Sequence, residues 1–154
     1  MPIASATAVL VQGAHILGLP VLVTEQYPKG LGRTVPEVAE HLAGARPIEK
    51  VAFSALAADG FAGALQESGR DQVLLCGIES HVCVNQTAED LIADDIEVHV
   101  SRDAVSSRTL ENRELGLDKM ERSGAVLTSV ETALFELLRE AGTPEFKQIQ
   151  GLIK

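Results

Sequence analysis

A cysteine between a predicted strand and a predicted helix is the residue best suited to chemistry. The apolar run Gln72–Ile78 predicts a buried strand, and Cys83 follows a short turn at the start of a helix predicted over residues 82–93. The positive end of a helix dipole favours a thiolate, and unpaired N–H groups in a first turn can hold an oxyanion. This position indicates a nucleophile. Free cysteines are also often buried structural residues, so spacing alone leaves both interpretations open.

Other side chains at the ends of predicted strands could surround such a nucleophile. Four of them are candidates to line a substrate pocket: Gln26, Tyr27, Phe53 and His81. Core packing is an equally good interpretation for Phe53. Arg108 is expected to pair with Asp103 or to cap a helix, and Cys76, in the middle of an apolar strand, is interpreted as structural.

Strands and helices alternate along the chain. Strands are predicted over residues 20–24, 47–51, 72–78, 97–100 and 125–128. Helices are predicted over residues 3–17, 36–42, 59–66 with Asp59 as its cap, 82–93, 110–122, 132–138 and 146–153. This alternation predicts one α/β domain over residues 1–154, with a parallel sheet between two layers of helices. Ligands bind at the carboxyl ends of the strands in such folds.

Composition excludes several function classes. The 154 residues carry 13 basic and 22 acidic side chains, a formal net charge of −9, which disfavours nucleic acids and anionic membranes as partners. No apolar run approaches the ~18 residues of a membrane span. Two cysteines are too few for a disulfide framework, so a cytoplasmic location is expected. The histidines lack metal-ligand spacing, and no phosphate-binding glycine motif is present, so we expect no metal and no cofactor.

Several segments together resemble one enzyme family. GIESHVCVNQTAEDL, VHVSRDAVSSR and GAVLTSVETALFELL, with TEQYPKGLG and IEKVAFSAL before them, resemble the isochorismatase-like cysteine hydrolases, in particular the isochorismatase-domain-containing proteins. The resemblance implies a Rossmann-like, three-layer α/β/α fold and a homo-oligomer, a dimer or larger. It implies that Cys83 is the nucleophile and Lys50 its catalytic lysine. It also implies a cis peptide bond between Ile78 and Glu79, and an oxyanion hole made by the backbone N–H groups of Glu79 and Cys83.

One catalytic residue of that family has no counterpart in this sequence. The family's catalytic Asp ends a first strand that precedes the first helix, whereas the first Asp here is Asp59. Absence of that central strand is expected to expose the edges of its two neighbours. Three explanations are open: a start that lies further upstream, an inactive relative, or replacement of the Asp by Glu25. We favour the first.

Two functions follow from these residues. The first is hydrolysis of a small amide, or a related C–N or C–O bond, in which Cys83 attacks, Lys50 stabilises the thiolate and backbone N–H groups hold the oxyanion. The alternative is a catalytically inactive family member that acts as an oligomeric binding or structural protein.

Overall fold

Five parallel strands form two sheets within residues 2–153, the part of the chain that the computed structural model describes. The two-stranded sheet pairs β1 (Thr24–Gln26) with β2 (Ile48–Lys50), so that Gln26 lies opposite Lys50. The three-stranded sheet has the order β3-β4-β5, with bounds Gln72–Ile78, Glu97–Ser106 and Val126–Thr128. Among the described residues, only β4 is paired along both edges, and β1, β2, β3 and β5 each pair along one.

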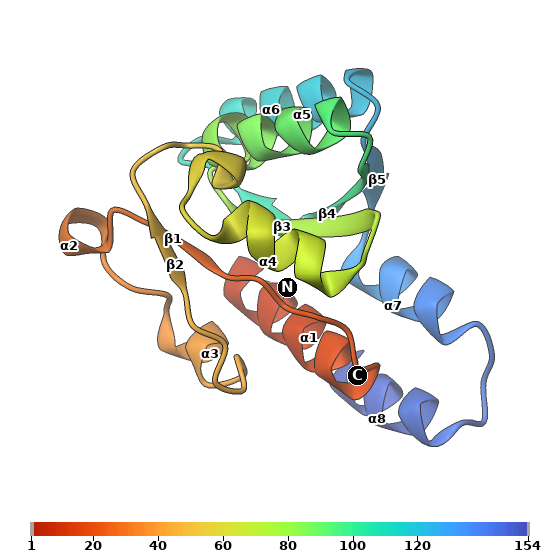
Figure 1. Ribbon diagram of the computed structural model, residues 1–154. Helices are drawn as coiled ribbons and strands as arrows, with labels where there is room; N and C mark the ends of the chain where they lie inside the picture. Colours follow the sequence, from red (N-terminus) through yellow and green to blue (C-terminus); the bar gives the residue numbers. More distant parts are fainter. Residues whose placement is uncertain (1, 154) are drawn as a thin grey trace.

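Helices cover both faces of the three-stranded sheet, as Figure 1 shows. One layer contains α5 and α6, and the opposite layer contains α1, α7 and α8. The helices are α1 (Ile3–Ile16), α2 (Pro28–Leu31), α3 (Pro36–Ala39), α4 (Phe61–Ser68), α5 (Asn85–Ala93), α6 (Leu110–Arg122), α7 (Val130–Leu138) and α8 (Pro144–Ile153). A 3-10 turn spans Ala55–Ala57, and a π-helical turn, Ser80–Val84, precedes α5. The predicted three-layer α/β/α fold is confirmed.

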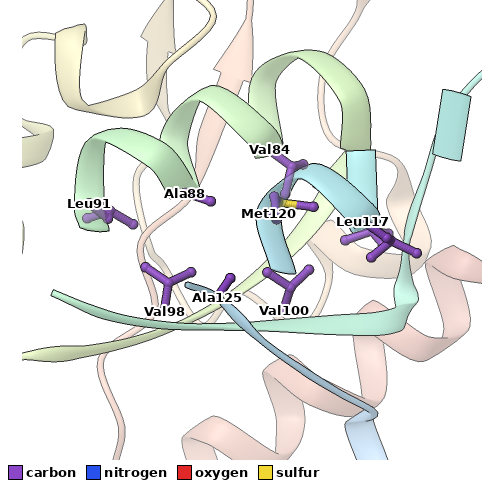
Figure 2. Close-up of a cluster of buried hydrophobic side chains, with 9 residues drawn as sticks. Val84, Ala88, Leu91, Val98, Val100, Leu117, Met120 and Ala125 are labelled. Carbon is purple, nitrogen blue, oxygen red and sulfur yellow. The ribbon is translucent and has the colours of Figure 1, made fainter. Parts of the chain in front are cut away.

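The largest core lies between the three-stranded sheet and α5 and α6 (Figure 2). Leu91 of α5, Val100 of β4 and Met120 of α6 are fully buried there. Burial of such side chains contributes about 1.5–3 kcal/mol each. This core fixes the end of β3 against the start of α5, and therefore fixes the turn that carries Cys83.

Helix α1 connects the two sheets through two different apolar surfaces. Ala6 and Leu10 pack in a cluster that includes Leu74 of β3. Val11 packs in another cluster with Val23, which directly precedes β1. Because β3 contributes to one cluster and the residue before β1 contributes to the other, α1 is a common support for the two sheets.

Some predicted element bounds are wrong for identifiable reasons. The strand predicted over residues 20–24 is observed at Thr24–Gln26, because the pairing with β2 begins only where the Ile48 N–H donates to the Val23 carbonyl. The helix predicted to begin at Asp59 begins at Phe61, after Gly60 in a left-handed conformation (φ 89°), and has no side-chain cap. Strand β4 continues to Ser106 instead of ending at residue 100. Within residues 2–153, none of the helices has the length and apolar character that crossing a membrane requires.

Candidate active site

Lys50, at the end of β2, is a buried cation without a buried anion beside it. Its side chain is 7% exposed, and its ammonium donates to the Gln26 amide Oε1 (2.5 Å) and to the carbonyls of Phe53 (2.7 Å) and Ala52 (3.1 Å). Within the described part of the chain, no carboxylate lies within ion-pair distance of this nitrogen. Neutral dipoles satisfy its hydrogen bonds but do not cancel its charge, so the site favours an anion nearby.

Cys83 and Lys50 both donate hydrogen bonds to one atom of Gln26. The Cys83 thiol donates to the same amide oxygen, Oε1, at a sulfur–oxygen distance of 3.8 Å. The amide nitrogen of Gln26 donates to the Val51 carbonyl at 2.8 Å, which fixes the orientation of the amide. Cys83 comes from the turn after β3 and Lys50 from β2, so residues 33 positions apart in the sequence share one hydrogen-bond acceptor.

The turn that carries Cys83 is held by its own backbone. The N–H groups of Val82 and Val84 both donate to the Glu79 carbonyl, at 3.1 and 3.2 Å. The peptide bond between Ile78 and Glu79 is cis, which is the bond that the family resemblance implied. Cys83 itself is half-buried, as is Cys76. An oxyanion role for the N–H groups of Glu79 and Cys83 stays a prediction.

His81 belongs to a polar cluster next to this turn. Its Nδ1 lies 3.0 Å from the Ser107 hydroxyl, and its Nε2 lies 3.5 Å from a Glu79 carboxylate oxygen. Within the described residues neither ring nitrogen bonds to Cys83. Arg108 donates to the same Glu79 carboxylate at 3.2 Å. The predicted pairing of Arg108 with Asp103 is therefore wrong, because Asp103 instead accepts the Val130 N–H at the start of α7.

Tyr27 and Phe53 flank Lys50 and are half exposed. Tyr27 lines an open hollow of about 310 Å³ whose wall also includes Lys50. The exposure of Phe53, 50%, excludes the alternative of core packing for this side chain. Both side chains are exposed, and a role for them in binding substrate stays a prediction.

The Glu25 carboxylate bonds to Arg33 and Thr34. Adjacent residues of a strand point to opposite faces, and the Glu25 carboxylate accepts the N–H and hydroxyl of Thr34, both at 2.9 Å, and the Arg33 guanidinium at 2.8 Å. Burial acts to raise the pKa of Glu25, but these bonds outweigh it, so the pKa lies below its usual value. These contacts give no support to Glu25 as a replacement for the family's Asp.

Cys76 has the properties of a structural thiol. It packs beside the cluster that contains Ala6 and Leu10 of α1. Burial raises the pKa of its thiol to about 11, although a hydrogen bond with Thr7 acts in the opposite direction. Cys76 and Cys83 therefore differ in surroundings although they are seven positions apart.

Comparison with known proteins gives the family. The model of the isochorismatase domain matches residues 2–132. The chain belongs to the isochorismatase family. Isochorismatase domain-containing protein 1 from Salmo salar is 46% identical over 146 residues, which are 94% of this chain and 51% of that protein. The chain thus spans about half the length of that curated relative. The secreted isochorismatase effector Isc1 from Phytophthora sojae is 45% identical over 152 residues, 96% of this chain and 72% of that protein.

A solved structure shows that the isochorismatase fold extends over the chain. The MAR1 ribonuclease from Caenorhabditis elegans superposes with a TM-score of 0.91 at 43% identity, covering 98% of this chain and 78% of that one. The family resemblance predicted from the sequence motifs is therefore confirmed.

Sequence reasoning missed two features of this isochorismatase-family site. Gln26 was predicted only as a pocket residue, whereas it is the acceptor shared by Cys83 and Lys50. Ser107 was not among the candidates from the sequence, yet its hydroxyl contacts both Ser80 and His81. Both residues follow or end strands, and that position was the only signal available.

Proposed function

We propose that this isochorismatase-family chain is a hydrolase that cleaves a small amide, or a related C–N or C–O bond, with Cys83 as its nucleophile. The observation that carries the proposal is the meeting of the Cys83 thiol and the Lys50 ammonium at the Gln26 amide oxygen. A cation that has no partner carboxylate among the described residues shares this oxygen with the half-buried thiol, and the thiolate is the form of cysteine that acts as a nucleophile.

The chemistry follows from these positions. The thiol gives its proton to water, and the Cys83 sulfur forms a bond to the substrate carbonyl carbon, whose oxygen takes the negative charge. The N–H groups of Glu79 and Cys83 would hold that oxygen. The C–N bond then breaks, the amine leaves with a proton from solvent, and a thioester remains. Water hydrolyses the thioester to a carboxylic acid and restores the thiol.

The partner class in this proposal is a small molecule. The half-exposed rings of Tyr27 and Phe53 beside Lys50 provide apolar surface for a small ligand. The Caenorhabditis elegans neighbour is named a ribonuclease, but the net charge of −9 on this chain disfavours a phosphate backbone. A cytoplasmic location and a homo-oligomer remain part of the proposal. Large exposed side chains, among them Leu31, Val51 and Leu110, support association.

A second candidate function is a catalytically inactive domain that binds or assembles. Within residues 2–153, no carboxylate is hydrogen-bonded to Cys83 or Lys50, so a general base of the family's type is not present there. Such a chain would keep the fold and its oligomeric contacts without turnover.

Hydrolysis by the purified chain separates the two functions. A panel of small aliphatic and aromatic amides would be incubated with wild type and with Cys83→Ala, with product acids measured by chromatography and the intact protein by mass spectrometry. We expect product formation and an acyl adduct on the Cys83 peptide in wild type, and neither in Cys83→Ala. Hydrolysis that survives in Cys83→Ala would refute the proposed nucleophile. Absence of both products and adducts across the panel would favour the binding function.

A further inference from the structure

We propose that Ser107 is a positioning residue: its hydroxyl holds the turn Ser80–Val84 in the orientation that directs the Cys83 thiol toward Gln26 and Lys50. This inference rests on the proposed function, because it concerns the same nucleophile. Ser107 directly follows β4, whose last residue, Ser106, pairs with Ile78 of β3. It therefore stands at the point where β3 ends and the cysteine turn begins.

The Ser107 hydroxyl makes three contacts with the start of this turn. It accepts the Ser80 N–H at 3.1 Å, lies 2.6 Å from the Ser80 hydroxyl and lies 3.0 Å from His81 Nδ1. A hydroxyl has one proton to donate and two lone pairs to accept with. Three contacts use this capacity completely.

One of the three bonds has a fixed direction, because the Ser80 backbone N–H can only donate to the Ser107 oxygen. Either hydroxyl can be the donor between Ser80 and Ser107, and the Ser80 hydroxyl also lies 3.2 Å from the Arg113 carbonyl. The direction of the bond to His81 Nδ1 depends on which ring nitrogen carries the proton. In each of these arrangements the Ser107 oxygen stays bonded to both Ser80 and His81.

Burial makes these bonds costly to lose. Ser80 is fully buried, and a buried donor or acceptor left without a partner destabilises the state that contains it. Helix α6 also packs against the turn at Gly116, where an added Cβ would lie 2.6 Å from backbone atoms of Ser80 and His81. The turn is therefore held by both Ser107 and α6.

The turn transmits this constraint to the cysteine. Cys83 lies three residues after Ser80, within a single backbone turn in which the Val82 and Val84 N–H groups share the Glu79 carbonyl. A rotation at Ser80 therefore moves the Cys83 sulfur relative to Gln26 Oε1, which is only 3.8 Å away. If Ser107 loses its hydroxyl, the buried Ser80 N–H has to find another partner, and the turn rearranges.

The test measures the reactivity of Cys83 and does not depend on turnover. The second-order rate of iodoacetamide alkylation at Cys83 would be read by peptide mass spectrometry in wild type, Ser107→Ala and Ser107→Thr. Ser129→Ala is the matched control, because the Ser129 hydroxyl also accepts a backbone N–H (Thr132, 3.1 Å) but lies at the start of α7. Melting temperatures would be recorded for all four proteins.

We expect Ser107→Ala to slow alkylation of Cys83 by about five- to tenfold, the effect of one or two lost hydrogen bonds. Ser107→Thr, which keeps the hydroxyl, restores the rate. Ser129→Ala lowers the melting temperature but leaves the Cys83 rate at the wild-type value. An unchanged or faster rate in Ser107→Ala would overturn the inference, as would equal slowing in Ser129→Ala or in Ser107→Thr.

A second measurement uses the wild-type protein alone, in case Ser107→Ala does not fold. Nitrogen-15 NMR of the His81 ring should show Nδ1 engaged in a hydrogen bond, and an Nδ1 without one would contradict the contact with Ser107. The outcomes also separate this inference from the proposed function. Slowed alkylation in a chain that hydrolyses no amide supports the role of Ser107 and rejects the hydrolase. Hydrolysis by wild type together with an unchanged alkylation rate in Ser107→Ala supports the hydrolase and rejects the role of Ser107.

Discussion

Replacement of Gly116 by alanine tests whether the close packing of α6 on the cysteine turn matters. An ideal Cβ on Gly116 lies 2.6 Å from the Ser80 carbonyl carbon, the Ser80 oxygen and the His81 nitrogen. All three are backbone atoms, so no side chain can rotate away. Ordinary contact begins near 3.4 Å, so the helix and the turn must separate by about 0.8 Å.

The expected loss of stability follows from that separation, and a second glycine of the chain provides a control. Forcing a methyl group into a packed interface costs about 1–3 kcal/mol, which in a chain of this size lowers the melting temperature by about 3–10 °C. Gly63, in the middle of α4, has nothing within 4 Å of its Cβ position. Gly63→Ala should therefore stabilise the protein by about 0.5–1 kcal/mol through helix propensity alone.

Two assays on these variants decide the matter. Thermal unfolding followed by circular dichroism should show opposite shifts for Gly116→Ala and Gly63→Ala. Alkylation of Cys83 by iodoacetamide should slow in Gly116→Ala and stay unchanged in Gly63→Ala, because only the former displaces the turn. A Gly116→Ala protein as stable as Gly63→Ala, or one that is destabilised while Cys83 keeps its wild-type rate, would refute this reasoning.

Three further predictions concern the charged and thiol groups. Lys50→Met should slow Cys83 alkylation by at least about tenfold, since it removes a buried charge that shares the Gln26 amide oxygen with the thiol. An unchanged rate in peptide mapping would contradict this. Because burial raises the pKa of Cys76 to about 11, the native protein should leave Cys76 unlabelled at pH 8, whereas urea should make it label like an ordinary thiol. The folded pKa of Glu25 lies below its usual value of 4.5, so its stabilising effect is present above that value and is lost as the pH falls through the folded pKa. Urea unfolding should accordingly show a gap between wild type and Glu25→Gln that is wide at pH 6 and narrow at pH 3.

Elements with strong local patterns could be predicted from the sequence. The bounds Gln72–Ile78 and Leu110–Arg122 match the structure because apolar periodicity and end signals agree there. The apolar run over residues 20–24 fits a strand equally well but pairs only at its end, because strand formation depends on a neighbouring edge that local sequence does not describe.

The candidate site was predictable in part. Position alone made Cys83 a candidate, the family resemblance added the expected roles of Cys83 and Lys50, and both side chains bond to the Gln26 amide in the structure. The role of Ser107 could not be predicted, because its bonds reach residues 26 and 27 positions away and leave no periodic pattern. Arg108 pairs with Glu79 for a similar reason: Asp103, closer in sequence, is already occupied by the first turn of α7.

The division of the strands into two sheets has a consequence for how the Cys83 thiol is held in position relative to Gln26 and Lys50. Cys83 follows the three-stranded sheet, whereas Gln26 and Lys50 belong to the two-stranded one, and no β-ladder joins them within residues 2–153. Their alignment therefore depends on packing between the sheets, which includes the apolar side chains of α1 and the bond from the Ala55 N–H to Thr87 of α5. Small rigid-body movements of one sheet relative to the other would change the sulfur-to-amide distance without breaking any strand pairing. Cys83 and Lys50 thus belong to two separately hydrogen-bonded parts of the fold, and substitutions in the contacts between these parts are expected to change the reactivity of Cys83 from a distance.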